Sequence, residues 1–219
     1  MPGLVNTEQI FLKFGNQDIQ ESSELLAQAF ADDPMFRLLF DGKNGMNYRK
    51  KFFEYILNKS ILLDEQFTGI VRDSKIACVA SIELPARIYG IKLFLRPLFI
   101  LKSIQLIFRI PFRAFNRINQ YMKLTMSVRP KEPHHYLVFI GVKPEFQKMG
   151  FGKKLLEYIH EMVDSDPKSV GIGLDTENPE NVSLYKHFGY ELVSESRLGN
   201  LTIYSMFRSK NVSKQQTHS

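Results

Sequence analysis

The chain has 219 residues, of which 44% are hydrophobic and 24% charged, so it has a globular composition and room for one domain with a substantial core. Its one cysteine, Cys78, excludes an internal disulfide and fits a reducing compartment. The first residues lack the charged and then apolar layout of a signal peptide, and we therefore expect a cytoplasmic protein.

The net charge of +6 is carried by one segment of the chain. Between residues 84 and 131 there are ten basic residues and no acidic one. The rest of the chain holds the other 19 of the 29 basic residues against all 23 acidic residues, so its net charge is −4. Such a local basic surface bears on the partners of a protein rather than on its fold. The ten residues are Arg87, Lys92, Arg96, Lys102, Arg109, Arg113, Arg117, Lys123, Arg129 and Lys131.

The first part of the chain predicts a strand, two helices and a hairpin. Residues 8–14 predict a short strand, and residues 21–34 predict a helix with an acidic start that ends before Pro34. Apolar residues at helical spacing predict a second helix over residues 48–63. Residues 67–84 predict two strands that are joined by a polar turn.

Residues 86–130, the basic segment, have a helical periodicity that is interrupted near Pro97 and Pro111. We expect two or three amphipathic helices, whose uncharged apolar runs are too short to span a bilayer. Three interpretations stay open: a solvated helical cap, which we favour, a lid over a pocket, or a basic surface that touches anionic lipid or nucleic acid. The aromatic residues of such a lid are Phe94, Phe99, Phe108, Phe112 and Tyr121.

Strands and helices alternate in the last part of the chain. Residues 134–142 predict a largely apolar strand suited to the middle of a sheet, and a helix follows it to about Asp164. Residues 169–176 predict another apolar strand, and residues 191–207 predict a closing hairpin.

A short helix between these last strands carries both of its boundary signals. Asn178 predicts the N-cap, Pro179 occupies the first helical position, and Gly189 predicts the stop. The polar residues 209–219 predict a disordered tail.

Gly150 and Gly152 stand where the helix after strand 134–142 should begin. The first turn of a helix leaves backbone N–H groups unpaired and carries a partial positive charge, and glycines let an anion approach those groups closely. Lys148, Lys153 and Lys154 add full positive charges. This arrangement predicts a cradle for a phosphate or pyrophosphate, although Gly-x-Gly at a helix start is also typical of tight helix–strand packing.

The two common nucleotide-binding loops do not fit this stretch. Gln147 stands where a Walker A loop needs its first glycine, and Leu155 stands where a dinucleotide fingerprint needs its third. A third pattern does fit. Val142-x-Pro144-x-x-Gln147-x-x-Gly150-x-Gly152 resembles the acetyl-CoA pyrophosphate loop of the GNAT family of N-acetyltransferases.

A second segment extends the resemblance. Asn178-Pro179-x-Asn181-x-x-Leu184-Tyr185-x-x-x-Gly189-Tyr190 is similar to the other diagnostic segment of that family. The stretch HHYL at the start of strand 134–142 is similar to the HWYL-like strand of a subgroup that includes puromycin-type acetyltransferases.

The resemblance implies an α/β (α+β) fold in which helices flank a central, mixed, twisted sheet of about seven strands. It implies one domain over residues 1–208, with residues 86–130 as a helical insert and residues 134–207 as the acetyl-CoA-binding core. Acetyl-CoA would be the cosubstrate and no metal would be needed.

The resemblance also places the cofactor. The pantetheine arm would lie between strands 134–142 and 169–175, which diverge, and its amides would pair with strand backbone around Ile140 and Val142. Gly141 is consistent with a bulge or a close ligand approach. The implied cofactor-binding residues are Ile140, Gly141, Val142, Gln147, Lys148, Met149, Gly150, Phe151, Gly152, Lys153, Asn181 and Tyr185.

Tyr185 is the general acid that the resemblance implies, because family members use a tyrosine here to donate to the CoA sulfur. Asn181 lies one helical turn earlier and so on the same side. It would hold the cofactor or an ordered water. A core aromatic at Tyr185 and a local capping role for Asn181 remain the alternatives.

The general base is less clear, since Tyr136 falls where relatives place a glutamate or a histidine. His134 is the first candidate because histidine titrates near neutral pH. Glu177 is the second. The alternatives are a surface histidine, a solvated loop acid, and a water chain that removes the proton.

We therefore predict an N-acetyltransferase that acts on a primary amine of a small molecule by direct attack in a ternary complex. Cys78 lies among apolar neighbours, the usual setting of an inert thiol, which argues against an acetylated cysteine. Acetylation of a protein lysine or N-terminus, and a non-catalytic CoA-binding or basic interaction module, are the alternatives. We expect a monomer or homodimer with no nucleic-acid partner, and at most a weak contact of residues 86–130 with an anionic surface.

Overall fold

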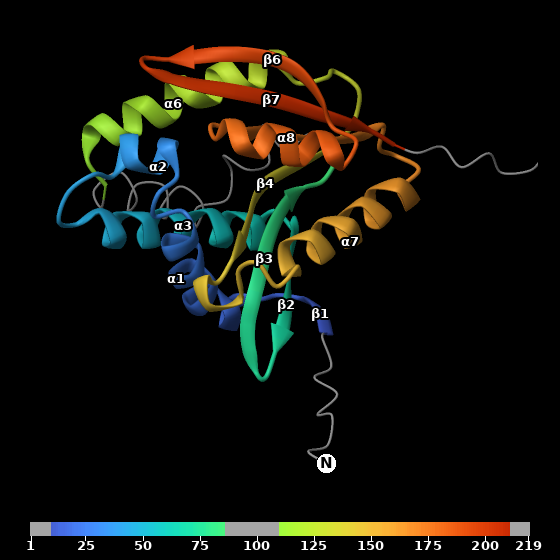
Figure 1. Cartoon of the computed structure of the whole chain (residues 1–219), viewed down its shortest axis with the longest axis horizontal. Coiled ribbons are helices and arrows are strands. Elements are labelled where there is room, and N and C mark those ends of the chain that lie inside the picture. The colour runs from blue at the N-terminus through green and yellow to red at the C-terminus, as the bar shows by residue number, and fades with distance from the viewer. Residues whose placement is uncertain (1–9, 86–109, 211–219) are drawn as a thin grey trace, which may run out of the picture.

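A single seven-stranded sheet organises the residues that this computed structural model describes, 10–85 and 110–210 (Figure 1). The strand order is β1-β2-β3-β4-β5-β7-β6. β4 and β5 run parallel, and every other neighbouring pair is antiparallel. The predicted mixed sheet of about seven strands is confirmed. The strands are β1 (Ile10–Lys13), β2 (Gln66–Arg72), β3 (Lys75–Glu83), β4 (His135–Val142), β5 (Gly171–Thr176), β6 (Glu191–Leu198) and β7 (Leu201–Ser209).

Helices cover both faces of this sheet (Figure 1). α7 packs on one face against β3, β4 and β5, while α1 and α3 pack against β2, β3 and β4 on the other. α6 lies against α2, β6 and β7, and α8 lies against β5 and β6. The helices are α1 (Ile19–Ala29), α2 (Pro34–Leu39), α3 (Gly45–Leu62), α6 (Phe112–Val128), α7 (Phe151–Ser165) and α8 (Pro179–His187), with 3-10 turns at Asn16–Asp18 and Pro144–Phe146.

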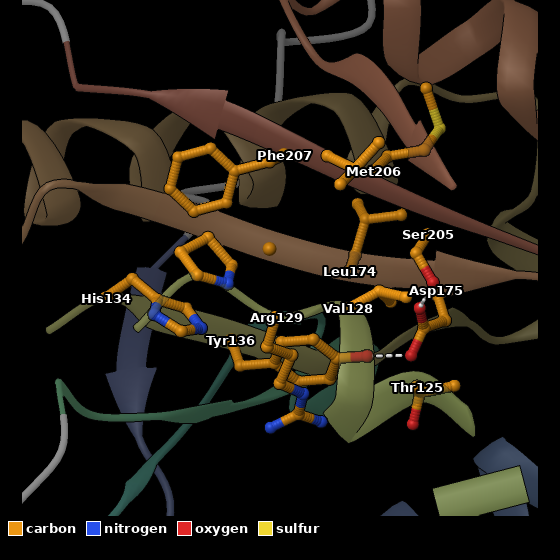
Figure 2. Close-up of a pocket in the computed structure, with 13 residues that line it drawn as sticks. Thr125, Val128, Arg129, His134, Tyr136, Leu174, Asp175, Ser205, Met206 and Phe207 are labelled. Carbon is orange, nitrogen blue, oxygen red and sulfur yellow. Dashed lines mark hydrogen bonds between the residues drawn. The ribbon is translucent and has the colours of Figure 1, made fainter. Parts of the chain in front are cut away.

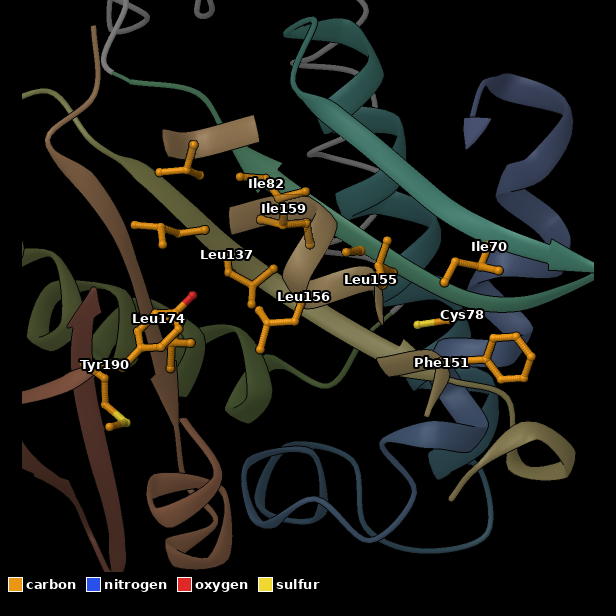
Figure 3. Packing of buried hydrophobic residues seen from close by; sticks show 14 of the residues in the cluster. Ile70, Cys78, Ile82, Leu137, Phe151, Leu155, Leu156, Ile159, Leu174 and Tyr190 are labelled. Atoms are coloured by element: carbon orange, nitrogen blue, oxygen red, sulfur yellow. The ribbon is translucent and has the colours of Figure 1, made fainter. Parts of the chain in front are cut away.

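β3 is buried on both faces, which fixes where the core lies. Cys78 and Ala80 belong to the apolar cluster under α7, whereas Val79 belongs to the cluster under α1 and α3. Successive side chains of a strand point to opposite faces of the sheet, and in β3 both faces are buried. Figure 3 shows the first cluster, in which Leu155 and Ile159 of α7 meet the sheet.

The prediction for residues 21–34 was wrong at its C-terminal end. α1 ends at Ala29, and Pro34 begins a separate helix, α2, instead of marking a stop. The side chain of Asp33 caps α2, because Oδ1 accepts hydrogen bonds from the backbone N–H groups of Met35 (2.9 Å) and Phe36 (3.1 Å). Proline is well suited to the first helical position, where its missing N–H has no partner to lose.

One of the predicted amphipathic helices of the basic segment, α6, lies within the described residues. Ala114 and Thr125 are buried on its inner side, whereas Phe112 is 78% exposed. The other helices predicted there, and Phe94, Phe99 and Phe108 with them, lie outside the described residues.

The closing strand extends further than predicted. β7 runs to Ser209, which pairs with Gly171, so this residue belongs to the sheet rather than to the tail. Residues 211–219 lie outside the described part of the chain. Among residues 10–85 and 110–210, no helix has both the length and the apolar composition needed to cross a membrane.

Candidate active site

The parallel strands β4 and β5 pair over three residues and then separate. His135, Tyr136 and Leu137 face residues 172–174, and no register continues beyond them. At this point β4 has one extra residue, Val138, because Ser81 of β3 pairs with Phe139 while the next residue of β3, Ile82, pairs with Leu137. Such a bulge bends the strand that carries it. The two strands therefore open toward their C-terminal ends, as predicted.

Backbone groups of β4 face this opening. The N–H of Lys143 donates to the carbonyl oxygen of Ala77 on β3 (2.9 Å). Because the backbone groups of an antiparallel strand alternate between its two edges, those of Val142 and Ile140 point to the other edge, toward β5. They are therefore placed to pair with amide groups of a ligand that enters between the strands.

Gly141 has a different role from the one predicted. The bulge lies at Val138 rather than here. A Cβ added to Gly141 would lie 2.7 Å from Cδ2 of Leu26, so the missing side chain lets α1 pack closely on β4. The group that approaches Gly141 closely is therefore helix α1.

The two glycines of the loop after β4 meet different requirements. Gly150 is the N-cap of α7 with φ +82°, a left-handed conformation that favours glycine, and a Cβ there would meet no atom within 4 Å. A Cβ on Gly152 would lie 3.2 Å from Cγ2 of Val142, so Gly152 lets α7 pack against β4. The space in front of the helix start is therefore open at Gly150.

The residues around this helix start fit an anion. The first N–H groups of α7 have no partner within the helix, and the end of the helix carries partial positive charge. Lys148 and Lys153 have exposed side chains, with Lys153 3.8 Å from Glu157. Gln147 closes the loop by donating from Nε2 to the carbonyl oxygen of Val142 (3.3 Å). A pyrophosphate would meet donors and positive charge here.

Of two other residues predicted in the loop, Met149 lies on the surface and Phe151 lies in the core. The side chain of Met149 is exposed. Phe151 is buried and packs edge-on against Phe146. Only the backbone of Phe151 can face a ligand, since its side chain belongs to the core.

α8 places Tyr185 and Asn181 next to the end of β5. Asn178 caps the helix by accepting from the N–H of Glu180 (3.0 Å), as predicted. Asn181 donates from Nδ2 to Oγ1 of Thr176 (3.3 Å), which ties α8 to β5. The ring of Tyr185 packs edge-on against that of Tyr190 with 5.5 Å between centroids.

Tyr185 retains its proton at neutral pH. Burial, with a contribution from the charge of Glu177, raises the pKa of its hydroxyl to about 12. The hydroxyl is thus available as a donor beside the opening between the strands.

Glu177 follows β5 directly and is the most perturbed carboxyl group of this region. Its pKa is raised from 4.5 to about 8: burial is the largest cause, the nearby Asp33 and Asp175 also raise the pKa, and the Tyr121 hydroxyl lowers it. Its Oε1 atom is buried and has no hydrogen-bond partner. A carboxylate with one unsatisfied oxygen can accept a proton or an N–H hydrogen bond from a bound molecule.

His134 lies at the other end of the same pair of strands. Its neighbour His135 pairs with Ile172, so six residues of β5 and its extension separate the level of His134 from Glu177. At about 3.3 Å per residue this is roughly 20 Å along the strand direction. The Nδ1 atom of His134 lies 2.7 Å from the carbonyl oxygen of Glu132, and its ring lies edge-on to Phe207. His134 and Glu177 cannot serve the same amine.

A polar group beside the opening was not found from the sequence. The Tyr136 hydroxyl donates to Asp175, and the hydroxyl of Ser205 donates to the same carboxylate at 2.6 Å (Figure 2). The guanidinium of Arg129 lies 3.2 Å from the centroid of the Tyr136 ring and pairs with Glu83 at 3.0 Å. The signal available in the sequence was that Asp175 and Glu177 are two residues apart, because such residues share a face of a strand.

The cavity shown in Figure 2 is too small to be the site of an acceptor. It lies between α6 and strands β4, β5 and β7, and its volume is about 10 Å³. That is about the space of one water molecule. The opening between β4 and β5, with Glu177 and Tyr185 beside it, is the candidate active site.

Cys78 lies away from this chemistry. Its side chain is fully buried in β3, and burial raises the pKa of its thiol to about 12. A thiol in this state is a poor nucleophile. Within residues 10–85 and 110–210, no three or more His, Cys, Asp or Glu side chains are grouped so as to hold a metal ion.

Comparison with known proteins matches part of the chain to a known type of domain. The model of the acetyltransferase (GNAT) domain matches residues 118–192, from α6 to the start of β6. This range contains the opening, the loop at α7, and the helix that carries Tyr185.

Solved acetyltransferase structures share the fold. A histone acetyltransferase HPA2 and related acetyltransferase from Corynebacterium glutamicum is 18% identical, with 91% of this chain and 95% of that chain covered and a TM-score of 0.67. Arylalkylamine N-acetyltransferase 2 from Aedes aegypti is 15% identical (93% and 100% covered, TM-score 0.64). The PaiA N-acetyltransferase from Thermoplasma acidophilum, solved with coenzyme A, is 12% identical (92% and 99% covered, TM-score 0.58).

A curated relative is much longer. The chain is 23% identical over 217 residues to a probable serine/threonine-protein kinase from Dictyostelium discoideum. The match covers 89% of this chain but only 22% of that protein, so the chain spans about a fifth of the length of the curated relative it matches.

Proposed function

We propose that this chain, which belongs to the GNAT family of N-acetyltransferases, transfers an acetyl group from acetyl-CoA to the primary amine of a small molecule. The observation that carries the proposal is the opening between β4 and β5, with Glu177 and Tyr185 beside it and an anion-binding helix start at its end.

Different residues would hold different parts of acetyl-CoA. The helix start at Gly150, with Lys148 and Lys153, would hold the pyrophosphate. The backbone groups of Ile140 and Val142 would pair with the amides of the pantetheine arm. When bound, acetyl-CoA supplies the acetyl group as a thioester.

Glu177 is the general base in this proposal, in place of His134. A free alkylamine is almost fully protonated at neutral pH, since its reference pKa is near 10.4. A carboxylate with a pKa of about 8 is a much better match to that ammonium than an ordinary carboxylate with a pKa of 4.5. The unpartnered Oε1 atom is the one that receives the proton.

Tyr185 acts as the general acid. Its hydroxyl keeps its proton at neutral pH and can donate it, or a hydrogen bond, to the sulfur as the thioester bond breaks. Cys78 takes no part, so the amine attacks directly while both substrates are bound.

The charges beside the opening favour a cationic acceptor. We call Asp33, Asp175 and Glu177 the acidic group, because the carboxylates of Asp33 and Asp175 both raise the pKa of Glu177. An ammonium group that approaches this group is attracted before it is deprotonated. Acceptance of small amines has a precedent in the similar fold of an arylalkylamine N-acetyltransferase, and the free thiol of Cys78 suits the cytoplasm, where we place the reaction.

The test is acetyl transfer by the purified chain to a panel of small primary amines and of peptides with a free N-terminus or lysine. Release of CoA is followed with a thiol reagent. Turnover of small amines above peptides supports the proposal, turnover of peptides alone moves the acceptor class to proteins, and turnover of neither overturns it.

Tyr185→Phe tests the assignment of the acid. It removes one hydroxyl and keeps the ring, so we expect kcat to fall about a hundredfold with little change in the KM for acetyl-CoA. Tyr158→Phe, on the exposed side of α7, is the matched control and should leave kcat unchanged. A Tyr185→Phe variant with full kcat would show that another donor protonates the sulfur.

A further inference from the structure

α8, the helix that carries Tyr185, has no buried residue of its own, so its position depends on contacts at its two ends. At its start, the side chain of Asn178 caps the helix and Asn181 donates to Thr176. At its other end, the residue that contacts the Tyr185 ring is Tyr190, which directly precedes β6.

The end of α8 is a Schellman motif that begins at Tyr185. Gly189 has φ +84°, and its N–H donates to the carbonyl oxygen of Lys186 (3.0 Å). The N–H of Tyr190 donates to the carbonyl oxygen of Tyr185 (3.1 Å). In this motif the first and last side chains are often in contact. Here the contact joins the rings of Tyr185 and Tyr190, whose centroids are 5.5 Å apart at an interplanar angle of 63°.

The far end of the Tyr190 side chain is held by α7. The Tyr190 hydroxyl lies 3.0 Å from Nε2 of His160, in a hydrogen bond between side chains that are only 2% and 8% exposed. Figure 3 shows Tyr190 among the side chains of the apolar cluster between α7 and the sheet. Burial lowers the pKa of His160 to about 4 and raises the pKa of Tyr190, so the bond joins two uncharged groups at neutral pH.

α7 is a rigid base for this hydrogen bond. Ile159 and Val163 of the same helix are fully buried. One turn after His160, both carboxylate oxygens of Asp164 accept hydrogen bonds from the guanidinium of Arg208 on β7 (2.9 and 2.8 Å). Two parallel bonds give such an ion pair a fixed geometry. The bond between His160 and the next side chain, that of Tyr190, therefore connects the end of α8 to a helix that is anchored in the core.

We propose that Tyr190 is the positioning residue for Tyr185 and that His160 holds Tyr190 in the orientation that this requires. Without the hydrogen bond to His160, the Tyr190 ring is free to tilt, and the Tyr185 ring that packs against it can move as well. A displacement of about 1 Å in a reacting group can lower a rate about a hundredfold. This inference rests on the proposed function, in which Tyr185 is the general acid.

Tyr190→Phe tests the positioning role, because it keeps the ring contact and removes only the hydroxyl. We expect kcat to fall about tenfold with little change in the KM for acetyl-CoA, since the acid is displaced and not removed. In a Tyr185→Phe background the same substitution should not lower kcat further, because the group through which Tyr190 acts is already absent. A merely structural role predicts the same fractional loss in both backgrounds.

His160 offers a pair of variants that differ in hydrogen bonding. His160→Leu leaves the Tyr190 hydroxyl without this partner and should lower kcat about tenfold, as Tyr190→Phe does. His160→Gln keeps an amide group in place of Nε2 and should retain most of the native kcat. His187→Leu, which removes an exposed histidine of α8, is the matched control and should leave kcat unchanged.

A second measurement does not depend on turnover. The ring carbons of Tyr185 can be followed by NMR in protein that contains isotope-labelled tyrosine, with Tyr185→Phe to identify their signals. These signals should shift or broaden in His160→Leu and keep their native positions in His160→Gln, although neither substitution touches the Tyr185 ring itself.

The outcomes separate this inference from the proposed function. A native chain that acetylates no amine defeats the proposed function, while the NMR signals of Tyr185 still decide whether His160 and Tyr190 position its ring. Tyr185 signals that are the same in the native protein and in His160→Leu overturn the positioning role. Full kcat in Tyr190→Phe, or an equal fractional loss with and without the Tyr185 hydroxyl, overturns it as well.

Discussion

Replacing Glu177 by glutamine should make the protein more stable at high pH and not at low pH. The pKa of Glu177 rises from 4.5 to about 8 on folding, a rise of about 3.5 units, and burial is its largest cause. At about 1.4 kcal/mol per unit, the ionised carboxylate costs the native state up to about 5 kcal/mol. For a group whose pKa is raised, stability is complete below pH 4.5 and is lost as the pH rises toward 8. Glutamine resembles the protonated form at every pH.

The assay is urea unfolding of the native protein and of Glu177→Gln at pH 5 and at pH 9. We expect the two proteins to differ little at pH 5, whereas the variant should be more stable by about 3–5 kcal/mol at pH 9. With a slope of about 2–3 kcal/mol per molar urea, the midpoint should shift by about 1–2 M. Glu180→Gln, which removes an exposed carboxylate of α8, is the control for charge alone. A difference between native protein and Glu177→Gln that is the same at both pH values would refute the buried, proton-binding state of Glu177.

Two further predictions concern the cofactor loop and the acidic group. Gly150→Asp should weaken acetyl-CoA binding, measured by calorimetry, at least tenfold relative to Gly150→Asn. Both variants must adopt the same left-handed backbone, and only the aspartate places a negative charge at the helix start. Equal affinities would contradict the anion cradle. Asp33→Asn keeps the cap of α2 and removes the charge that repels ionised Glu177, so the acidic limb of kcat/KM should move to lower pH. An upward or absent shift would contradict the coupling of these two acids.

Local signals in the sequence predicted the boundaries of α8 well. Asn178 and Pro179 start α8 and Gly189, with φ +84°, follows its end, because capping needs only residues that are close in sequence. The same signal was missed at Asp33 and Pro34. Proline ends one helix or begins the next, and only the capping bonds of Asp33 distinguish the two.

The remaining features depend on long-range pairing, which one sequence does not display. The bulge falls at Val138 because β3 fixes the register of β4, and nothing in the local sequence marks that residue. We prefer Glu177 to His134 because β4 and β5 separate toward their C-terminal ends, which is where Glu177 lies and His134 does not. Thr125 of α6 and Asp175 of β5 line one cavity although they are 50 positions apart, so helical periodicity could identify the buried face of α6 but not what it meets.

The charge of the chain and the charge of its candidate active site have opposite signs, and α6 explains how both are maintained. The exposed side of this helix carries Arg113 and Lys123, whereas Thr125 on its inner side lines a cavity with Asp175 of the acidic group. Arg129, the cation that does reach inward, is held by Glu83 and by the Tyr136 ring. A lysine in place of Thr125 would place a cation beside Asp175 and lower the pKa of Glu177, and the base would then be less well matched to an ammonium group. α6 thus lies beside the acidic group without cancelling its charge, because Arg113 and Lys123 are on the exposed side of the helix and Thr125 is on the buried side.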